Sequence, residues 1–203
     1  MSLSDRLRDM GSQYVAAQLT HPTVVGIGRG DLDPAVFRRW LEQDYLFLLD
    51  YVRVFSRLAW QAPDGHVGDL VDLAHATWHD ELDLHRALAA DFGADLDGAT
   101  KSATCTAYTA FLLAASASYS TGLAAVLPCM WGYSEIGQRL AADPPAEPRY
   151  AKWIEMYADP AFATLADRCA EMLDESAPNE TVAERVFLSA FDHELAFWDV
   201  GAD

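Results

Sequence analysis

The residues of this chain best suited to chemistry are one cysteine and two acidic residues. Cys129 directly follows Pro128, inside a segment that otherwise reads as one helix. A proline within a helix removes a backbone hydrogen bond and usually bends the axis, at a cost of about 3 kcal/mol. With Trp131 and Tyr133 close behind, this segment can present a thiol to a small aromatic ligand. A buried structural cysteine beside an ordinary kink explains it equally simply, since free cysteines are commonly buried.

Each of the two acidic residues interrupts an apolar stripe at helical spacing. Asp44 lies on a stripe with Phe37, Leu41 and Leu48, and Glu194 shares the stripe of Phe191 in the last predicted helix. An ionised carboxylate is costly to bury without a partner, and burial raises its pKa toward the range useful for acid–base catalysis. The pattern therefore fits either a catalytic pair or two structural hydrogen-bonding groups.

Three tyrosines add hydroxyl groups that need partners when buried. They are Tyr108, Tyr133 and Tyr157, and Tyr133 lies one helical turn after Cys129. Aromatic residues at helical spacing belong to a hydrophobic core more often than to a ligand site. Each of these tyrosines, taken by itself, is therefore more simply explained as a core residue.

Composition restricts the class of protein. The chain has 203 residues, of which 51% are hydrophobic, and is expected to form a single domain over 1–203. No apolar run approaches the roughly 18 residues needed to span a membrane, and no signal peptide is evident. The net charge of -17 argues against nucleic acid or an anionic membrane as a partner. Three widely spaced cysteines predict a cytoplasmic location without a disulfide framework.

The chain reads as an all-α protein, a compact helical bundle with short loops. Asp33 is a good N-cap and Pro34 suits the first helical position, so together they mark the start of the second helix. A turn is expected at 63–65, a break near 120–122 and a loop over 143–148. The predicted helices cover about 3–19, 34–62, 67–91, 102–119, 121–142, 150–158, 160–176 and 179–199.

Taken in order, several blocks of this sequence resemble the TenA / thiaminase II family. The most specific are the Leu-Pro-Cys block of 127–137 and the terminal block of 194–199. The other blocks that carry the resemblance are 21–22, 24–30, 37–48 and 51–55. The resemblance spans most of the chain and implies a fold similar to that of haem oxygenase, without haem or another cofactor, in a homotetramer.

The resemblance also implies an activity. Members of this family hydrolyse thiamin-type pyrimidines at the aminomethyl carbon, and the main salvage substrate is 4-amino-5-aminomethyl-2-methylpyrimidine. The products are the hydroxymethyl pyrimidine and ammonia, and some members also cleave thiamin. One branch of the family uses a cysteine nucleophile and another uses glutamate, so Cys129 is similar to the cysteine branch.

Position by position, the resemblance gives roles to individual residues. Cys129 would be the nucleophile, Glu194 the general acid and base, and Asp44 the carboxylate that binds the pyrimidine amino and ring nitrogens and orients the thiol. The remaining binding residues include two hydroxyl donors, Tyr108 and Tyr133, and two rings that would stack on the pyrimidine, Phe47 and Tyr157. Many members carry tyrosine where this chain has Phe47, so stacking is retained and a hydroxyl contact is lost.

Two other functions stay open at this point. The first is a non-haem di-iron oxidase on the same helical architecture, although paired ligand motifs on facing helices are not evident. Its metal-ligating residues would be His75, His79, Glu81, His85, Glu135 and His193. The second is a protein that binds a pyrimidine or thiamin without converting it, for which the aromatic residues would suffice and the cysteine would not be needed.

Overall fold

The computed structural model describes residues 1–202, and helices make up all of its regular structure. Ten α-helices and one π-helical turn follow one another along the chain. Their bounds are α1 Leu3–Leu19, α2 Pro22–Arg29, α3 Pro34–Gln61, α4 Asp64–Ala76, η1 Thr77–Glu81, α5 Leu82–Phe92, α6 Ala103–Ala115, α7 Tyr119–Ala141, α8 Pro148–Ala158, α9 Pro160–Glu175 and α10 Glu180–Phe197. The all-α prediction is confirmed.

The predicted start of α3 is confirmed in detail. The Asp33 side chain accepts a hydrogen bond from the Ala35 N–H at 2.8 Å, and Pro34 occupies the first helical position. The N-cap carboxylate satisfies one of the backbone donors that a helix leaves unpaired at its start. The cap therefore fixes the residue at which α3 begins.

Two elements differ from the predictions. Helix α2 was not predicted, although Pro22 opens it and Gly30 ends it with a φ of 74°; at eight residues it is too short to show a clear apolar period. The break expected near 120–122 lies instead at 116–118, between α6 and α7. The helix predicted over 67–91 is a continuous helical run that contains the π turn η1.

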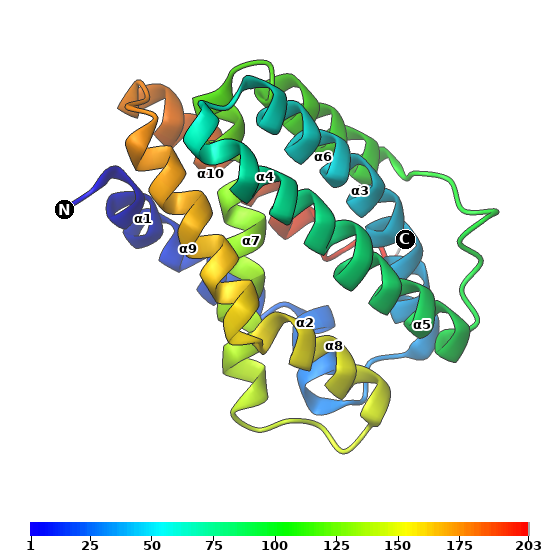
Figure 1. Ribbon diagram of the computed structural model, residues 1–203. Helices are drawn as coiled ribbons and strands as arrows, with labels where there is room; N and C mark the ends of the chain where they lie inside the picture. The colour runs from blue at the N-terminus through cyan, green and yellow to red at the C-terminus, as the bar shows by residue number, and fades with distance from the viewer. Residues whose placement is uncertain (203) are drawn as a thin grey trace.

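Helix α7 lies at the centre of the molecule. It packs against α10, α8 and α9, while α3 packs against α4, α5 and α6 (Figure 1). The helix continues through Pro128, and the buried Tyr51 hydroxyl of α3 donates to the Val126 carbonyl of α7 at 2.9 Å. Helices α3 and α7 are thereby joined directly beside the Pro128–Cys129 step.

Within residues 1–202, no helix is both long and apolar enough to cross a bilayer.

Helices α7 and α8 approach each other closely at Gly137. A Cβ atom at this position would lie 2.4 Å from the backbone carbon of Tyr157 and 2.7 Å from the nitrogen of Ala158. Backbone atoms cannot move aside as a flexible side chain can. Glycine at 137 therefore sets the distance between the helix that carries Cys129 and the helix that carries Tyr157.

We predict that Gly137→Ala destabilises the protein by about 1–3 kcal/mol, because the extra methyl group forces α7 and α8 apart. Gly132→Ala is the matched control on the same helix, since its Cβ would lie 3.6 Å from the nearest side-chain atom. Alanine is favoured over glycine inside a helix by up to about 1 kcal/mol, so this control should be neutral or stabilising. Thermal denaturation measures both, and equal melting temperatures would contradict the close-approach explanation.

Candidate active site

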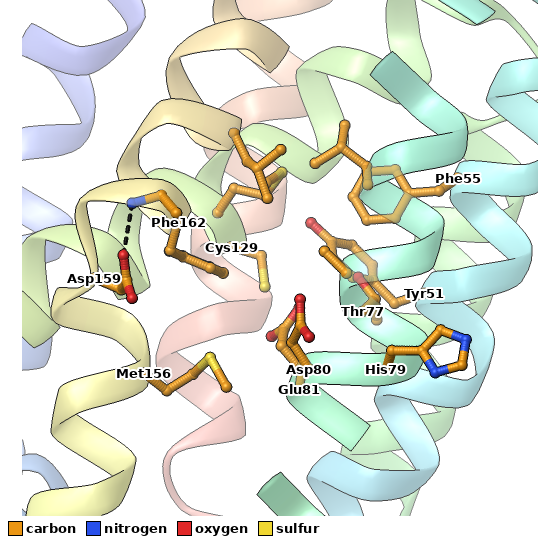
Figure 2. Close-up of a pocket in the computed structure, with 15 residues that line it drawn as sticks. Tyr51, Phe55, Thr77, His79, Asp80, Glu81, Cys129, Met156, Asp159 and Phe162 are labelled. Carbon is orange, nitrogen blue, oxygen red and sulfur yellow. Dashed lines mark hydrogen bonds between the residues drawn. The ribbon is translucent and has the colours of Figure 1, made fainter. Parts of the chain in front are cut away.

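A cavity of about 440 Å³ opens between η1, α7 and the start of α9. Figure 2 shows Cys129 and the acidic residues of η1 on its walls. The walls are mostly apolar, with a few polar groups, as is typical of sites for small molecules. The lining residues are Tyr51, Phe55, Leu73, Ala76, Thr77, His79, Asp80, Glu81, Cys129, Met130, Met156, Asp159, Ala161, Phe162 and Leu165.

Cys129 is the half-buried thiol of this cavity, whereas Cys105 and Cys169 are fully buried. All three cysteines are free. Burial raises the pKa of Cys129 well above its usual range, and the nearby carboxylates Glu194, Glu81 and Asp44 raise it further. The resting thiol is therefore protonated, and a base has to remove its proton before the sulfur can attack a substrate.

Glu194 lies next to the cavity, in the packed layer behind it, and is only 1% exposed. Its Oε1 accepts a hydrogen bond from the Tyr108 hydroxyl. Burial raises the pKa of Glu194 to about 8, although hydrogen bonds from Tyr108 and from the Cys129 thiol oppose the increase. A carboxyl group that titrates near neutral pH can act as both acid and base, which suits the role predicted for it.

Asp44 is also buried, at 3% exposed, and its partner is His85. The distance from Asp44 Oδ2 to His85 Nε2 is 2.6 Å, and His85 Nδ1 lies 2.8 Å from the backbone carbonyl oxygen of Glu81. The expectation that Asp44 and Glu194 are buried carboxylates is confirmed, and each has a specific hydrogen-bond partner.

The Glu81 side chain forms a third buried carboxyl group, and it faces the cavity. Tyr157 donates a hydrogen bond to Glu81 Oε2 at 3.3 Å. Burial raises the pKa of Glu81 to about 7, while the charge of His85 acts in the opposite direction. Glu81 ends the π turn, in which the Leu82 N–H bonds to the Thr77 carbonyl five residues earlier. Such turns are frequent at functional sites because they redirect individual side chains.

The aromatic residues predicted for the site also come together, in the layer next to the cavity rather than on its walls. The ring centroids of Phe47 and Tyr108 are 4.9 Å apart, and those of Tyr133 and Tyr157 are 5.0 Å apart. In this structure the Phe47 ring stacks on that of Tyr51, while the Tyr157 ring is tilted against that of Tyr133, so a pyrimidine would have to replace some of those contacts. Tyr157 also packs edge-on against Phe162 of the cavity wall, at 5.2 Å.

The residues considered for a di-metal site do not form a set of metal ligands in the part of the chain that the structure describes. Among residues 1–202, no three or more His, Cys, Asp and Glu side chains are placed to hold a metal ion. His85 is taken up by Asp44, His193 stacks on Tyr108 at 5.2 Å, and Glu135 pairs with Arg139 on the surface. The four-residue spacing does bring Glu81 and His85 into contact. The contact is a hydrogen bond between the His85 ring and the backbone carbonyl of Glu81, so it does not involve the Glu81 carboxylate.

Sequence analysis missed three residues as members of this site: Tyr51, Glu81 and His85. Tyr51 follows Asp44 and Phe47 on the same face of α3, so helical spacing alone could have identified it. Glu81 and His85 were noticed only as possible metal ligands. Their actual partners depend on how η1 packs against α3, which no local pattern reveals.

The chain is similar to known proteins over most of its length. The model of the TENA/THI-4/PQQC family matches residues 4–203. The chain belongs to the TENA/THI-4/PQQC family. The predicted resemblance is therefore confirmed.

Two relatives match this family member over nearly its whole length. A protein of Halalkalibacterium halodurans named aminopyrimidine aminohydrolase is 38% identical, over 98% of this chain and 95% of that protein. A protein of Bacillus subtilis with the same name is 31% identical, over 98% of this chain and 89% of that protein.

Solved structures agree with the family fold. A TenA homologue from P. horikoshii superposes with a TM-score of 0.91 at 25% identity, covering 99% of this chain and 98% of that one. A domain from Shewanella denitrificans described as having a heme oxygenase-like fold gives a TM-score of 0.76 at 13% identity, covering 100% and 92%. The expected haem oxygenase-like fold is confirmed.

Proposed function

We propose that this protein is an aminopyrimidine aminohydrolase of the thiaminase II type, acting in thiamin salvage. The observation that carries the proposal is the free Cys129 thiol on an apolar cavity, with the Glu194 and Asp44 carboxyl groups beside it. The names of the full-length relatives support the same reaction. The proposed substrate is 4-amino-5-aminomethyl-2-methylpyrimidine, with thiamin as the alternative.

In the first half of the reaction, Glu194 in its ionised form takes the Cys129 proton as the sulfur adds to an electron-poor ring carbon. The addition breaks the aromaticity of the ring and pushes electrons toward the aminomethyl side chain. The carbon–nitrogen bond then breaks, and the amine leaves as ammonia with the proton that Glu194 returns. A pKa of about 8 allows Glu194 to take up and release this proton near neutral pH.

In the second half, water adds to the exocyclic methylene carbon and gives up a proton to Glu194. The sulfur then leaves the ring and recovers a proton, which restores aromaticity and yields the hydroxymethyl pyrimidine. Asp44 would accept hydrogen bonds from the pyrimidine amino group and hold the ring in attack geometry. Tyr108, Tyr133, Phe47 and Tyr157 would complete the binding site around it.

The test is product formation from the aminomethyl pyrimidine and, separately, from thiamin, with the wild type and Cys129→Ser in parallel. Release of ammonia and hydroxymethyl pyrimidine by the wild type alone would support the proposal. If well-folded wild type converts neither compound but melts at a higher temperature with the pyrimidine, the protein is a binder that lacks turnover.

We also propose that the protein works in the cytoplasm as a homotetramer. Three free thiols suit a reducing compartment. Trp60 is 88% exposed and Trp78 is 44% exposed, and large apolar side chains of this kind are commonly buried between subunits. Sedimentation analysis of the full chain tests the assembly.

A further inference from the structure

His85 is the least accessible polar side chain near the cavity, with 0% of its surface exposed. It connects two elements that are distant in sequence. Its Nδ1 lies 2.8 Å from the backbone carbonyl oxygen of Glu81, and its Nε2 lies 2.6 Å from Asp44 Oδ2. None of the proposed chemical steps uses this histidine, so its complete burial and double hydrogen bonding need a separate explanation.

The carbonyl contact determines where one hydrogen lies. A carbonyl oxygen can only accept, so Nδ1 of His85 carries a hydrogen and donates it to Glu81. The second hydrogen bond then has two possible forms. Either the hydrogen is on Nε2, which makes His85 an imidazolium and Asp44 a carboxylate, or it is on Asp44, which leaves both groups neutral.

The charges around the cavity favour the first form. Three carboxyl groups, Asp44, Glu81 and Glu194, are buried within the same region. Among residues 1–202, His85 is the only basic side chain in hydrogen-bond contact with any of them. Because one buried cation can balance one buried anion, a single carboxyl group is expected to be ionised at rest, and contact selects Asp44.

The effects of burial and of neighbouring charges on the pKa values of His85, Glu81 and Glu194 agree with this charge balance. Burial by itself would lower the pKa of His85, but the hydrogen bond and charge of Asp44 and the contacts with Glu81 raise it overall. The other two carboxyl groups have no basic side chain in hydrogen-bond contact, and burial raises the pKa of Glu81 to about 7 and of Glu194 to about 8. Both groups therefore keep a proton up to a higher pH than an exposed carboxyl group does.

We propose that His85 is a positioning residue that keeps Asp44 ionised and fixes its orientation, with Oδ2 held by the imidazolium and Oδ1 left to accept a hydrogen bond from the amino group of an aminopyrimidine. This proposal rests on the proposed function for its ligand, although the charge state of the pair does not. If the shared proton were on Asp44 Oδ2, Oδ1 would be the oxygen of a neutral carboxyl group, which is a weaker acceptor than a carboxylate oxygen, so binding of the amino group would be weakened. The π turn matters because it supplies the Glu81 carbonyl that orients the imidazole ring.

Two amide variants separate the two hydrogen bonds of His85. His85→Gln replaces Nε2 with an N–H that can reach Asp44, and His85→Asn replaces Nδ1 with an N–H that can reach the Glu81 carbonyl. Calorimetry with 4-amino-5-hydroxymethyl-2-methylpyrimidine should give about 10- to 100-fold weaker binding for His85→Asn and a substantial rescue for His85→Gln. Equal affinities for both variants and the wild type would overturn the positioning role.

A ligand without the 4-amino group provides the matched control. Removing that group should weaken binding to the wild type strongly and to His85→Asn only slightly, because the contact with Asp44 is already impaired in the variant. If removal of the amino group costs the same affinity in both proteins, His85 does not act through Asp44.

Nitrogen NMR of the full chain labelled with ¹⁵N-histidine tests the charge state without any ligand. Both ring nitrogens of His85 should show the shifts of protonated nitrogen at pH 7, and Asp44→Asn should return Nε2 to the unprotonated shift. An unprotonated Nε2 in the wild type at pH 7 would overturn the proposal even if turnover is observed. Conversely, if the protein binds no pyrimidine but His85 is an imidazolium, the proposed function is refuted, whereas the ion pair between His85 and Asp44 is supported.

Discussion

Replacing Cys129 with serine is expected to lower turnover of the aminopyrimidine at least about a thousandfold and to leave the helical fold intact. A serine hydroxyl is far harder to ionise than a thiol, and Glu194 can remove a proton only from a group of reasonable acidity. Since Cys129 is half-buried on an open cavity, the smaller oxygen atom should leave little strain behind. The measurement is kcat, together with the circular dichroism and melting temperature of both proteins.

The matched control for this substitution is Cys105→Ser. Cys105 is fully buried away from the cavity, and its sulfur already donates to the Gln43 carbonyl at 3.5 Å, so a serine hydroxyl would have an acceptor. Its turnover should stay within a few-fold of the wild type. A Cys129→Ser protein that retained wild-type rates would remove Cys129 from the role of nucleophile, whatever the result for Cys105→Ser.

Much of this site could be predicted because its acidic residues interrupt apolar stripes at helical spacing. Charged side chains are normally found on the solvent-exposed face of a helix, so such interruptions stand out in the sequence. Asp44 and Glu194 stand among apolar residues at helical spacing, and both prove to be buried. Helical period and caps also located α1, α3 and α10 closely, because hydrophobic burial and N-capping are local properties of the sequence.

The partners of these residues could not be predicted in the same way. The contact between His85 and Asp44 joins residues 41 positions apart, and it depends on the π turn that ends at Glu81. A π turn has no strong sequence signature. Here η1 packs against α3, a contact between residues far apart in the sequence that no local pattern reveals. Spacing alone correctly indicated that Glu81 and His85 are neighbours on a helix, but it suggested a metal site where the structure has a backbone hydrogen bond.

Glu194→Gln is expected to have opposite effects on activity and on stability. Loss of the acid–base group should lower kcat by about 10²- to 10⁴-fold. The fold should tolerate the change, because the amide oxygen of glutamine can still accept the hydrogen bond from Tyr108. The groups that face Glu194 are Tyr108 from α6, Cys129 from α7 and Asp44 from α3, and none of them is a cation.

The sign of the stability effect follows from the raised pKa. Burial lifts the pKa of Glu194 from 4.5 to about 8, so between these values the folded protein holds a proton that the unfolded chain has released. The free energy of unfolding therefore decreases as the pH rises through this window, and the loss is complete above the folded pKa. Glutamine has no proton to lose, so the variant avoids this penalty, which is on the order of a few kcal/mol.

Melting temperatures at pH 5, 7 and 9 measure the effect. Near pH 5 the wild type and Glu194→Gln should be similar, and near pH 9 the variant should be the more stable protein. A decline with pH should remain in the variant, since the raised pKa of about 7 for Glu81 acts in the same direction. Glu184→Gln, at a half-buried position of the same helix, should follow the wild-type curve. If Glu194→Gln also follows it, the pKa of Glu194 is not raised in the folded protein, and the explanation of the pH dependence is wrong.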